Sequence, residues 1–199
     1  MPKAPGHSKG IKTNGLIKTF NVKLDQSILS VKAEKSDAEE NVQAFHKCGS
    51  AGHVCITDSL GHSTPGNKNP LKLVVDASEG FIPLWQQGVS LRWKFNSASL
   101  ALFEASEDLK NYIRQLMAAA IYAWDSAAPV KFVEHNGVCD FEIFVSPQDS
   151  CSFNGCTLAS AFFPGGGQQR VYIYPQMFQQ SEKEQVETMI HEFGHIFGL

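Results

Sequence analysis

Residues 191–198 read HEFGHIFG, an H-E-x-x-H motif followed by x-x-G. Two histidines four positions apart lie one above the other on one face of a helix, so His191 and His195 can reach a single metal ion. Glu192, between them, can take a proton from a water bound to that metal. We therefore expect His191 and His195 to be zinc ligands and Glu192 to be a general base.

The sequence on either side of the motif predicts the helix that carries it. Ser181 and Glu184 form S-x-x-E, a capping box that starts a helix at about Glu182. Gly198 favours a sharp turn at the other end, because glycine adopts positive φ at little cost. Apolar residues at helical spacing lie between these ends: Val186, Met189, Ile190 and Phe193. With this chain's own composition, the four fixed residues of the motif would occur by chance in roughly one such chain in a thousand.

Composition limits the classes of protein that the chain can represent. It has 199 residues, of which 43% are hydrophobic and 19% charged, as suits one substantial core or a domain with a smaller partner. The formal net charge of −3 gives no nucleic-acid footprint, so we expect no nucleic-acid partner. No run of eighteen apolar residues exists, so we expect no membrane span.

The location of the protein is less directly indicated. Residues 1–16 contain lysines but lack the apolar segment of a secretory signal, so an upstream start, another export route and an intracellular location all remain open. Five cysteines are present, and Cys48/Cys55 and Cys151/Cys156 are close enough to close short loops, with Cys139 left over. Spacing alone does not fix the pairing, and buried reduced cysteines are the alternative. We favour a secreted or extracellular protein.

The chain divides into three predicted parts. Residues 1–15 are a basic, disordered tail, residues 16–84 are a β-rich region of unknown role, and residues 85–199 are the catalytic domain. In the β-rich region, β-like segments are expected at 20–24, 28–31, 53–57 and 71–76, with a loop at 61–70. In the third part, Ser106 is expected to cap a helix that runs to about Asp125. Strands are expected at 91–95, 130–133, 141–145, 158–163 and 171–174, which makes an α+β fold.

With these segments in place, residues 85–199 resemble a matrixin-like catalytic domain of the metzincin metalloproteases. Besides the H-E-x-x-H-x-x-G run, the resemblance lies in four segments: 91–95, 119–134 (AAIYAWDSAAPVKFVE), 140–143 and 158–165. It implies a twisted, mostly parallel sheet with two long helices. It also implies a zinc endopeptidase in which Glu192 is catalytic, His191 and His195 bind zinc, and an extended polypeptide substrate pairs with residues 159–163.

Some elements of that family have no match here. A third histidine would follow two positions past Leu199, and the methionine turn is also absent. The lack of histidine between His135 and His191 argues against a structural zinc, whereas Asp149, Asn154 and Gly155 could form a calcium loop. Latent members place a propeptide cysteine on the zinc. The run 47–49, Lys-Cys-Gly, resembles that element weakly, so for Cys48 we favour a disulfide to Cys55 or a buried thiol.

Two other functions remain open on the sequence. A non-catalytic binding or effector module could keep a metalloprotease fold, but the intact Glu192 argues against it. A different zinc hydrolase could take its third ligand from a distant glutamate, but Gly198 disfavours that arrangement.

Overall fold

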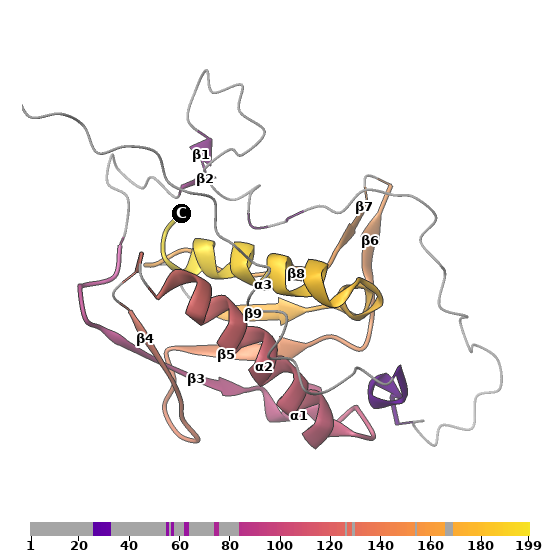
Figure 1. Ribbon diagram of the computed structural model, residues 1–199. Helices are drawn as coiled ribbons and strands as arrows, with labels where there is room; N and C mark the ends of the chain where they lie inside the picture. Colours follow the sequence, from indigo (N-terminus) through magenta and orange to yellow (C-terminus); the bar gives the residue numbers. More distant parts are fainter. Residues whose placement is uncertain are drawn as a thin grey trace, which may run out of the picture.

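The computed structural model describes residues 26–32, 55, 57, 62–63, 74–75, 84–125, 127–128, 130–153, 155–165 and 169–199. Most of the regular structure lies between residue 84 and Leu199 (Figure 1). The tail expected at residues 1–15 and the strand expected at 20–24 lie outside the described residues.

A five-stranded sheet forms the centre of the molecule, in the order β4-β3-β5-β9-β8. Four strands run parallel, and β8 pairs antiparallel with β9 at one edge. The strands are β3 (Ser90–Phe95), β4 (Lys131–Glu134), β5 (Phe141–Val145), β8 (Ala159–Ser160) and β9 (Arg170–Ile173). The sheet is therefore mostly parallel, as the family resemblance implies.

Two long helices pack next to each other over the sheet: α2 (Ser106–Trp124) and α3 (Glu182–Ile196) (Figure 1). Their apolar faces and the inward side chains of the strands form one core. The expected boundaries of both helices are confirmed within a residue or two. The expected cap of α2 is wrong, because Ser106 is its first helical residue and Ala105 at the N-cap makes no side-chain hydrogen bond. The short helices α1 (Ser97–Leu100) and η5 (Pro175–Gln179) were not expected.

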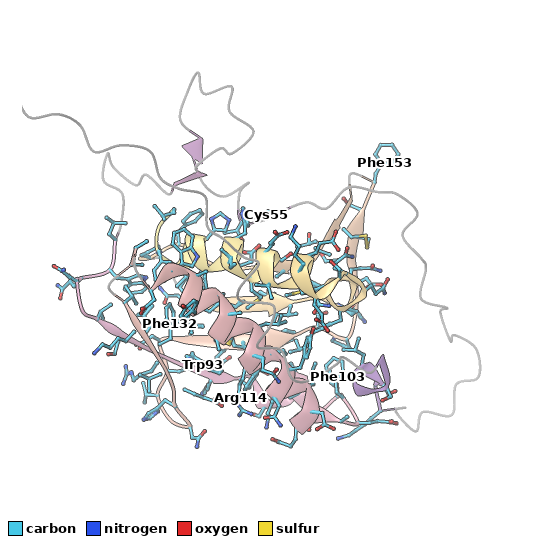
Figure 2. All side chains as sticks on the ribbon, viewed as in Figure 1. Cys55, Trp93, Phe103, Arg114, Phe132 and Phe153 are labelled. Atoms are coloured by element: carbon cyan, nitrogen blue, oxygen red, sulfur yellow. A yellow bond between two sulfur atoms is a disulfide. The ribbon has the colours of Figure 1, made fainter. Side chains whose placement is uncertain are left out.

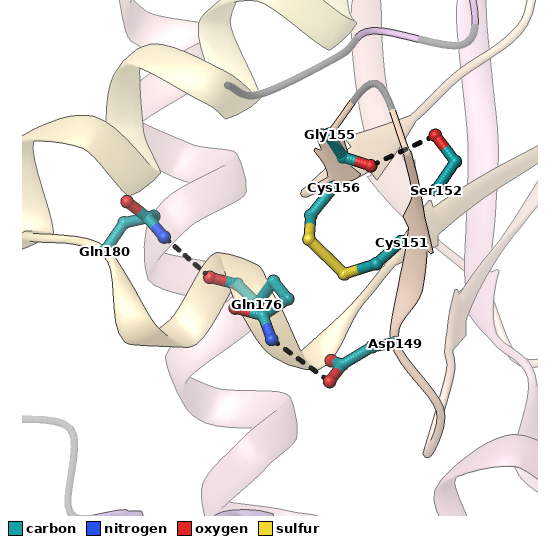
Figure 3. The surroundings of a disulfide bond; sticks show 7 residues. All are labelled: Asp149, Cys151, Ser152, Gly155, Cys156, Gln176 and Gln180. Carbon is teal, nitrogen blue, oxygen red and sulfur yellow. Dashed lines mark hydrogen bonds between the residues drawn. A yellow bond between two sulfur atoms is a disulfide. The ribbon is translucent and has the colours of Figure 1, made fainter. Parts of the chain in front are cut away.

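The hairpin of β6 (Ser150–Ser152) and β7 (Gly155–Thr157) is also not predicted from the sequence. The Cys151–Cys156 disulfide joins its strands, which confirms one of the two cysteine pairs considered above (Figure 3). The edge strand expected at 158–163 is shorter, because Leu158 separates β7 from β8 and residues 161–163 leave the ladder.

The amino-terminal part is described only in pieces. Residues 28–29 were expected to be β-like but belong to the 3-10 helix η3 (Gln26–Leu29), where the Ser30 N–H donates to the Ser27 carbonyl at 3.1 Å. Val31 then bridges to Phe103, as expected of an extended residue. Strand β1 (His62–Ser63) pairs with β2 (Val74–Val75), so the loop expected at 61–70 is wrong at its start.

No helix among the described residues combines the length and apolarity needed to cross a membrane.

Candidate metal centre

Helix α3 is held at both ends by local hydrogen bonds. At its start, the Glu184 N–H donates to Ser181 Oγ and the Ser181 N–H donates to the Glu184 carboxylate, so the predicted capping box is confirmed. At its end, Gly198 has a φ of 94°. The N–H groups of Gly198 and Leu199 donate back to the carbonyls of residues 195 and 194, the pattern of a Schellman motif. The chain therefore turns where the sequence places its glycine.

Two tryptophans hold the functional half of α3 in place. The indole N–H of Trp124 donates to the Ile190 carbonyl at 2.8 Å, and that of Trp85 donates to the Ile196 carbonyl at 2.6 Å. Gly194 lies against Trp124, where a Cβ would be 3.3 Å from the ring. The small residue between Glu192 and His195 thus allows close packing of the helix on α2.

The imidazoles of His191 and His195 meet as their spacing predicts. Their Nε2 atoms are 3.1 Å apart. His195 is buried, and its Nδ1 lies 2.8 Å from the backbone oxygen of Leu199. Because that oxygen only accepts hydrogen bonds, Nδ1 carries the proton and Nε2 presents a lone pair. His191 is exposed, so the pair is open to solvent on one side.

Cys55 is the third donor of the site. Its Sγ is 3.5 Å from His195 Nε2 and 3.6 Å from Glu192 Oε1, and Figure 2 places it against α3. The ligand atoms of Cys55, His191 and His195 all lie within 4.8 Å of one another. No other group of three or more His, Cys, Asp or Glu side chains in the described part of the chain is arranged to hold a metal.

Two of the three donor separations are close to those of a tetrahedral zinc site, and the third, between His191 and Cys55, is within 4.8 Å. With Zn–N distances of about 2.0–2.1 Å and a Zn–S distance of about 2.3 Å, tetrahedral angles separate two nitrogens by about 3.3 Å and a nitrogen from a sulfur by about 3.5 Å. The observed separations are 3.1 Å between the nitrogens and 3.5 Å between His195 Nε2 and the sulfur. Two imidazoles and a thiolate are also ligands that zinc prefers.

Glu192 faces this cluster from the interior. Its side chain is 2% exposed, and its Oε2 lies 3.4 Å from the hydroxyl of Thr57. A buried carboxylate beside the donor set has the position that a general base requires. Next to it, a cavity of about 280 Å³ is lined by Leu158 and Ala159 at the start of β8, by residues of α3 and by Cys55. The predicted edge strand and the predicted motif therefore border the same cavity.

The outcome for the expected site residues is mixed. The structure brings His191, Glu192 and His195 together, as expected. Cys48 lies outside the described residues, and the Cys48–Cys55 disulfide considered above is wrong, because Cys55 forms no disulfide. Cys55 was missed as a donor. It is 136 residues before His191, and no local pattern distinguishes it from Cys48.

The suggested calcium loop stays a prediction. The Asp149 carboxylate accepts a hydrogen bond from Gln176 Nε2 at 3.1 Å, which links the hairpin base to η5 (Figure 3). Gly155 is buried in β7, and Asn154 lies outside the described residues.

Comparison with known proteins gives little further guidance. No protein-family model matches the chain, and no curated protein sequence matches it. Among solved structures, the structure of myroilysin, a metalloprotease, is similar with a TM-score of 0.38 and 15% sequence identity. The match covers 58% of this chain and 50% of that one, so the chain spans about half the length of that protein.

Proposed function

We propose that this chain belongs to a zinc-dependent endopeptidase of the matrixin-like metzincin type. The observation that carries the proposal is that two imidazoles and a buried carboxylate converge on one side of α3. The Nε2 atoms of His191 and His195 are 3.1 Å apart, and Glu192 is buried beside them. The substrate class is an extended polypeptide, because the outer edge of β8 borders the cavity beside these residues. A secreted or extracellular location accompanies this proposal, in keeping with the Cys151–Cys156 disulfide.

A bound zinc ion would polarise the scissile carbonyl and lower the pKa of a water molecule. His191 and His195 would hold that ion through Nε2, with the tautomer of His195 fixed by its Nδ1 contact to Leu199. Glu192 would take the proton of the attacking water and pass it to the leaving amine. Its burial excludes competing solvent from the carboxylate while Oε1 still faces the donor cluster.

The position of Cys55 supports the proposal that this is a latent form of the site. The sulfur sits 3.6 Å from Glu192 Oε1 and completes a three-donor set with the two histidines. A water that replaces the sulfur would lie next to Glu192, so thiol and attacking water exclude each other. Family members that are held latent by a cysteine use the same chemistry. Among the described residues, Cys55 is the cysteine that we propose for this role.

Metal binding provides the first test. The chain should bind about one zinc, and Cys55→Ala should weaken that binding by at least about tenfold, because two histidines alone leave the site short of a third protein ligand. Zinc affinity can be measured with a competing chelator. Cys139→Ala, which removes a half-buried thiol elsewhere, should leave the affinity unchanged. Equal affinity of wild type and Cys55→Ala would show that Cys55 is not a ligand.

Hydrolysis provides the second test. In excess zinc, and in a chain extended beyond Leu199 to supply a third protein ligand, Cys55→Ala should cleave an unstructured polypeptide. The double variant Cys55→Ala/Glu192→Gln should lose about a hundredfold or more of that rate while binding zinc equally well, because only the proton acceptor is removed. A non-catalytic module would show no cleavage in either variant. Undiminished cleavage by the double variant would contradict the role of Glu192.

A further inference from the structure

Thr57 lies at the point where the edge strand approaches the candidate base. Its side chain is 1% exposed, between Ala161, which follows β8, and Glu192 on α3. The Ala161 N–H donates to Thr57 Oγ1 at 2.9 Å. The Thr57 hydroxyl lies 3.4 Å from Glu192 Oε2 and 3.5 Å from the Ala161 carbonyl oxygen, so these two acceptors share its single proton. One hydroxyl thus connects the sheet edge to the carboxylate.

The amide that Thr57 engages is on the free side of the sheet. The Leu158 carbonyl accepts from Tyr174, on the β9 side, and Ser160 pairs with Tyr172 there. Because successive residues of a strand alternate in direction, the N–H of Ala161 points away from β9. That outward N–H is the group an added peptide strand would use for backbone pairing.

The candidate base is contacted on both of its oxygens. Cys55 Sγ lies 3.6 Å from Glu192 Oε1, and Thr57 Oγ1 lies 3.4 Å from Oε2. Two residues from the amino-terminal part therefore cover the carboxylate, one beside the histidine pair and one beside the edge strand. Only the first of these contacts involves an atom of the donor set, so the second does not depend on a metal.

We propose that Thr57 is a second inhibitory contact, which occupies the carboxylate of Glu192 and the outward N–H of Ala161 whether or not a metal is bound. The inhibitory role rests on the proposed endopeptidase function, whereas the contact itself does not. Release of Cys55 from the histidines would then leave the cleft still closed by Thr57. The cleft opens fully only when both Cys55 and Thr57 leave it. Displacement of the Cys55 thiol and access of the substrate are therefore two separate steps.

The contact is tested first in the metal-free chain by hydrogen exchange and thiol modification. Thr57→Val keeps the side-chain shape but removes the hydroxyl. It should speed exchange of the Ala161 amide by roughly ten- to a hundredfold, because that amide loses its acceptor. It should also raise the rate at which N-ethylmaleimide modifies Cys55, measured by peptide mapping. Unchanged rates for both would overturn the proposal.

Two variants separate this effect from general loosening. Thr57→Ser keeps the hydroxyl and should exchange like wild type. Ser99→Ala removes another buried hydroxyl that accepts a backbone N–H, that of Val145 at 3.3 Å, away from the site. It should leave Ala161 and Cys55 unaffected. If Ser99→Ala accelerates both as strongly as Thr57→Val, the effect is global and the proposal fails.

The inhibitory role is tested in excess zinc with a fluorogenic unstructured peptide, again in a chain extended beyond Leu199 to supply a third protein ligand. Cys55→Ala/Thr57→Val should cleave it about ten times faster than Cys55→Ala alone. Equal rates would overturn the inhibitory role while leaving the endopeptidase function intact. A third outcome is that both variants bind zinc but neither cleaves the peptide, while Ala161 still exchanges fast in Thr57→Val. That outcome would reject both the endopeptidase function and the inhibitory role. The contact between Thr57 and Ala161 would then be structural only.

Discussion

The two long helices are stabilised in different ways. Helix α2 starts at Ser106, and its N-cap, Ala105, provides no side-chain hydrogen bond. Among the buried residues of α2, only Tyr112 has a polar side-chain group. Helix α3 has a capping box, a glycine turn and two indole hydrogen bonds. It also buries three polar side chains: Gln185, Glu192 and His195. Because buried polar groups destabilise a fold unless they are hydrogen-bonded, the helix that carries the site needs these polar contacts in addition to its packing, whereas α2 relies mainly on packing.

The largest effect should follow from loss of packing on α2. Leu116→Ala removes a fully buried side chain and should lower the free energy of unfolding by about 2–5 kcal/mol. Zinc affinity of the folded protein should change little, because the substitution leaves the hydrogen bonds of Trp124 and Trp85 to α3 in place. Urea unfolding and chelator competition measure the two quantities. Tyr122→Ala on the exposed face of α2 should change stability by less than about 0.5 kcal/mol, and a larger loss there would contradict the distinction.

The hydrogen bond between the helices should give the next largest effect. Tyr112 donates to Gln185 Oε1 at 2.9 Å, so Tyr112→Phe leaves a buried acceptor without its donor and should cost about 1–3 kcal/mol at neutral pH. Burial, and to a lesser extent the charge of Glu182, raises the pKa of Tyr112 to about 12.

The pH dependence of that variant follows from the sign of the shift. The pKa of Tyr112 is higher in the folded state than its ordinary value of 10, so its stabilising contribution is complete below about pH 10 and is lost as the pH rises to about 12. Tyr112→Phe should flatten the stability profile in that window. A profile as steep as that of wild type would show that another group dominates the alkaline loss.

The smallest effects concern the caps. Ser181→Ala removes the side-chain acceptor of α3 and should cost about 1 kcal/mol. Ala105→Ser offers α2 the acceptor it lacks and should stabilise the fold by at most about 0.5 kcal/mol, since the backbone at Ala105 is not in the extended conformation usual for a cap. Thermal unfolding of both variants measures the difference. A gain at Ala105 as large as the loss at Ser181 would contradict the contrast between the helices.

What the sequence predicts here depends on how local the signal is. The boundaries of α3 follow from Ser181, Glu184 and Gly198, because capping and glycine turns involve only near neighbours. The strands follow from short apolar segments, whereas their mostly parallel arrangement was implied only by the family resemblance. By contrast, Cys55 and Thr57 are more than a hundred residues before the residues of the site that they contact. No repeating pattern in the sequence indicates such contacts. The sequence also predicts the wrong cap for α2. It places the cap at Ser106, whereas the N-cap is the preceding residue, Ala105, which makes no side-chain hydrogen bond.

The indole hydrogen bonds to Ile190 and Ile196 fix both the rotation and the axial position of α3. The histidines are thereby oriented by folding itself, before any ion arrives. In a zinc finger, metal binding and folding are one event, so a chelator unfolds the domain. Here a chelator should empty the site and leave the fold intact. Mutations can then alter metal affinity and thermal stability separately, which allows the two properties to evolve independently.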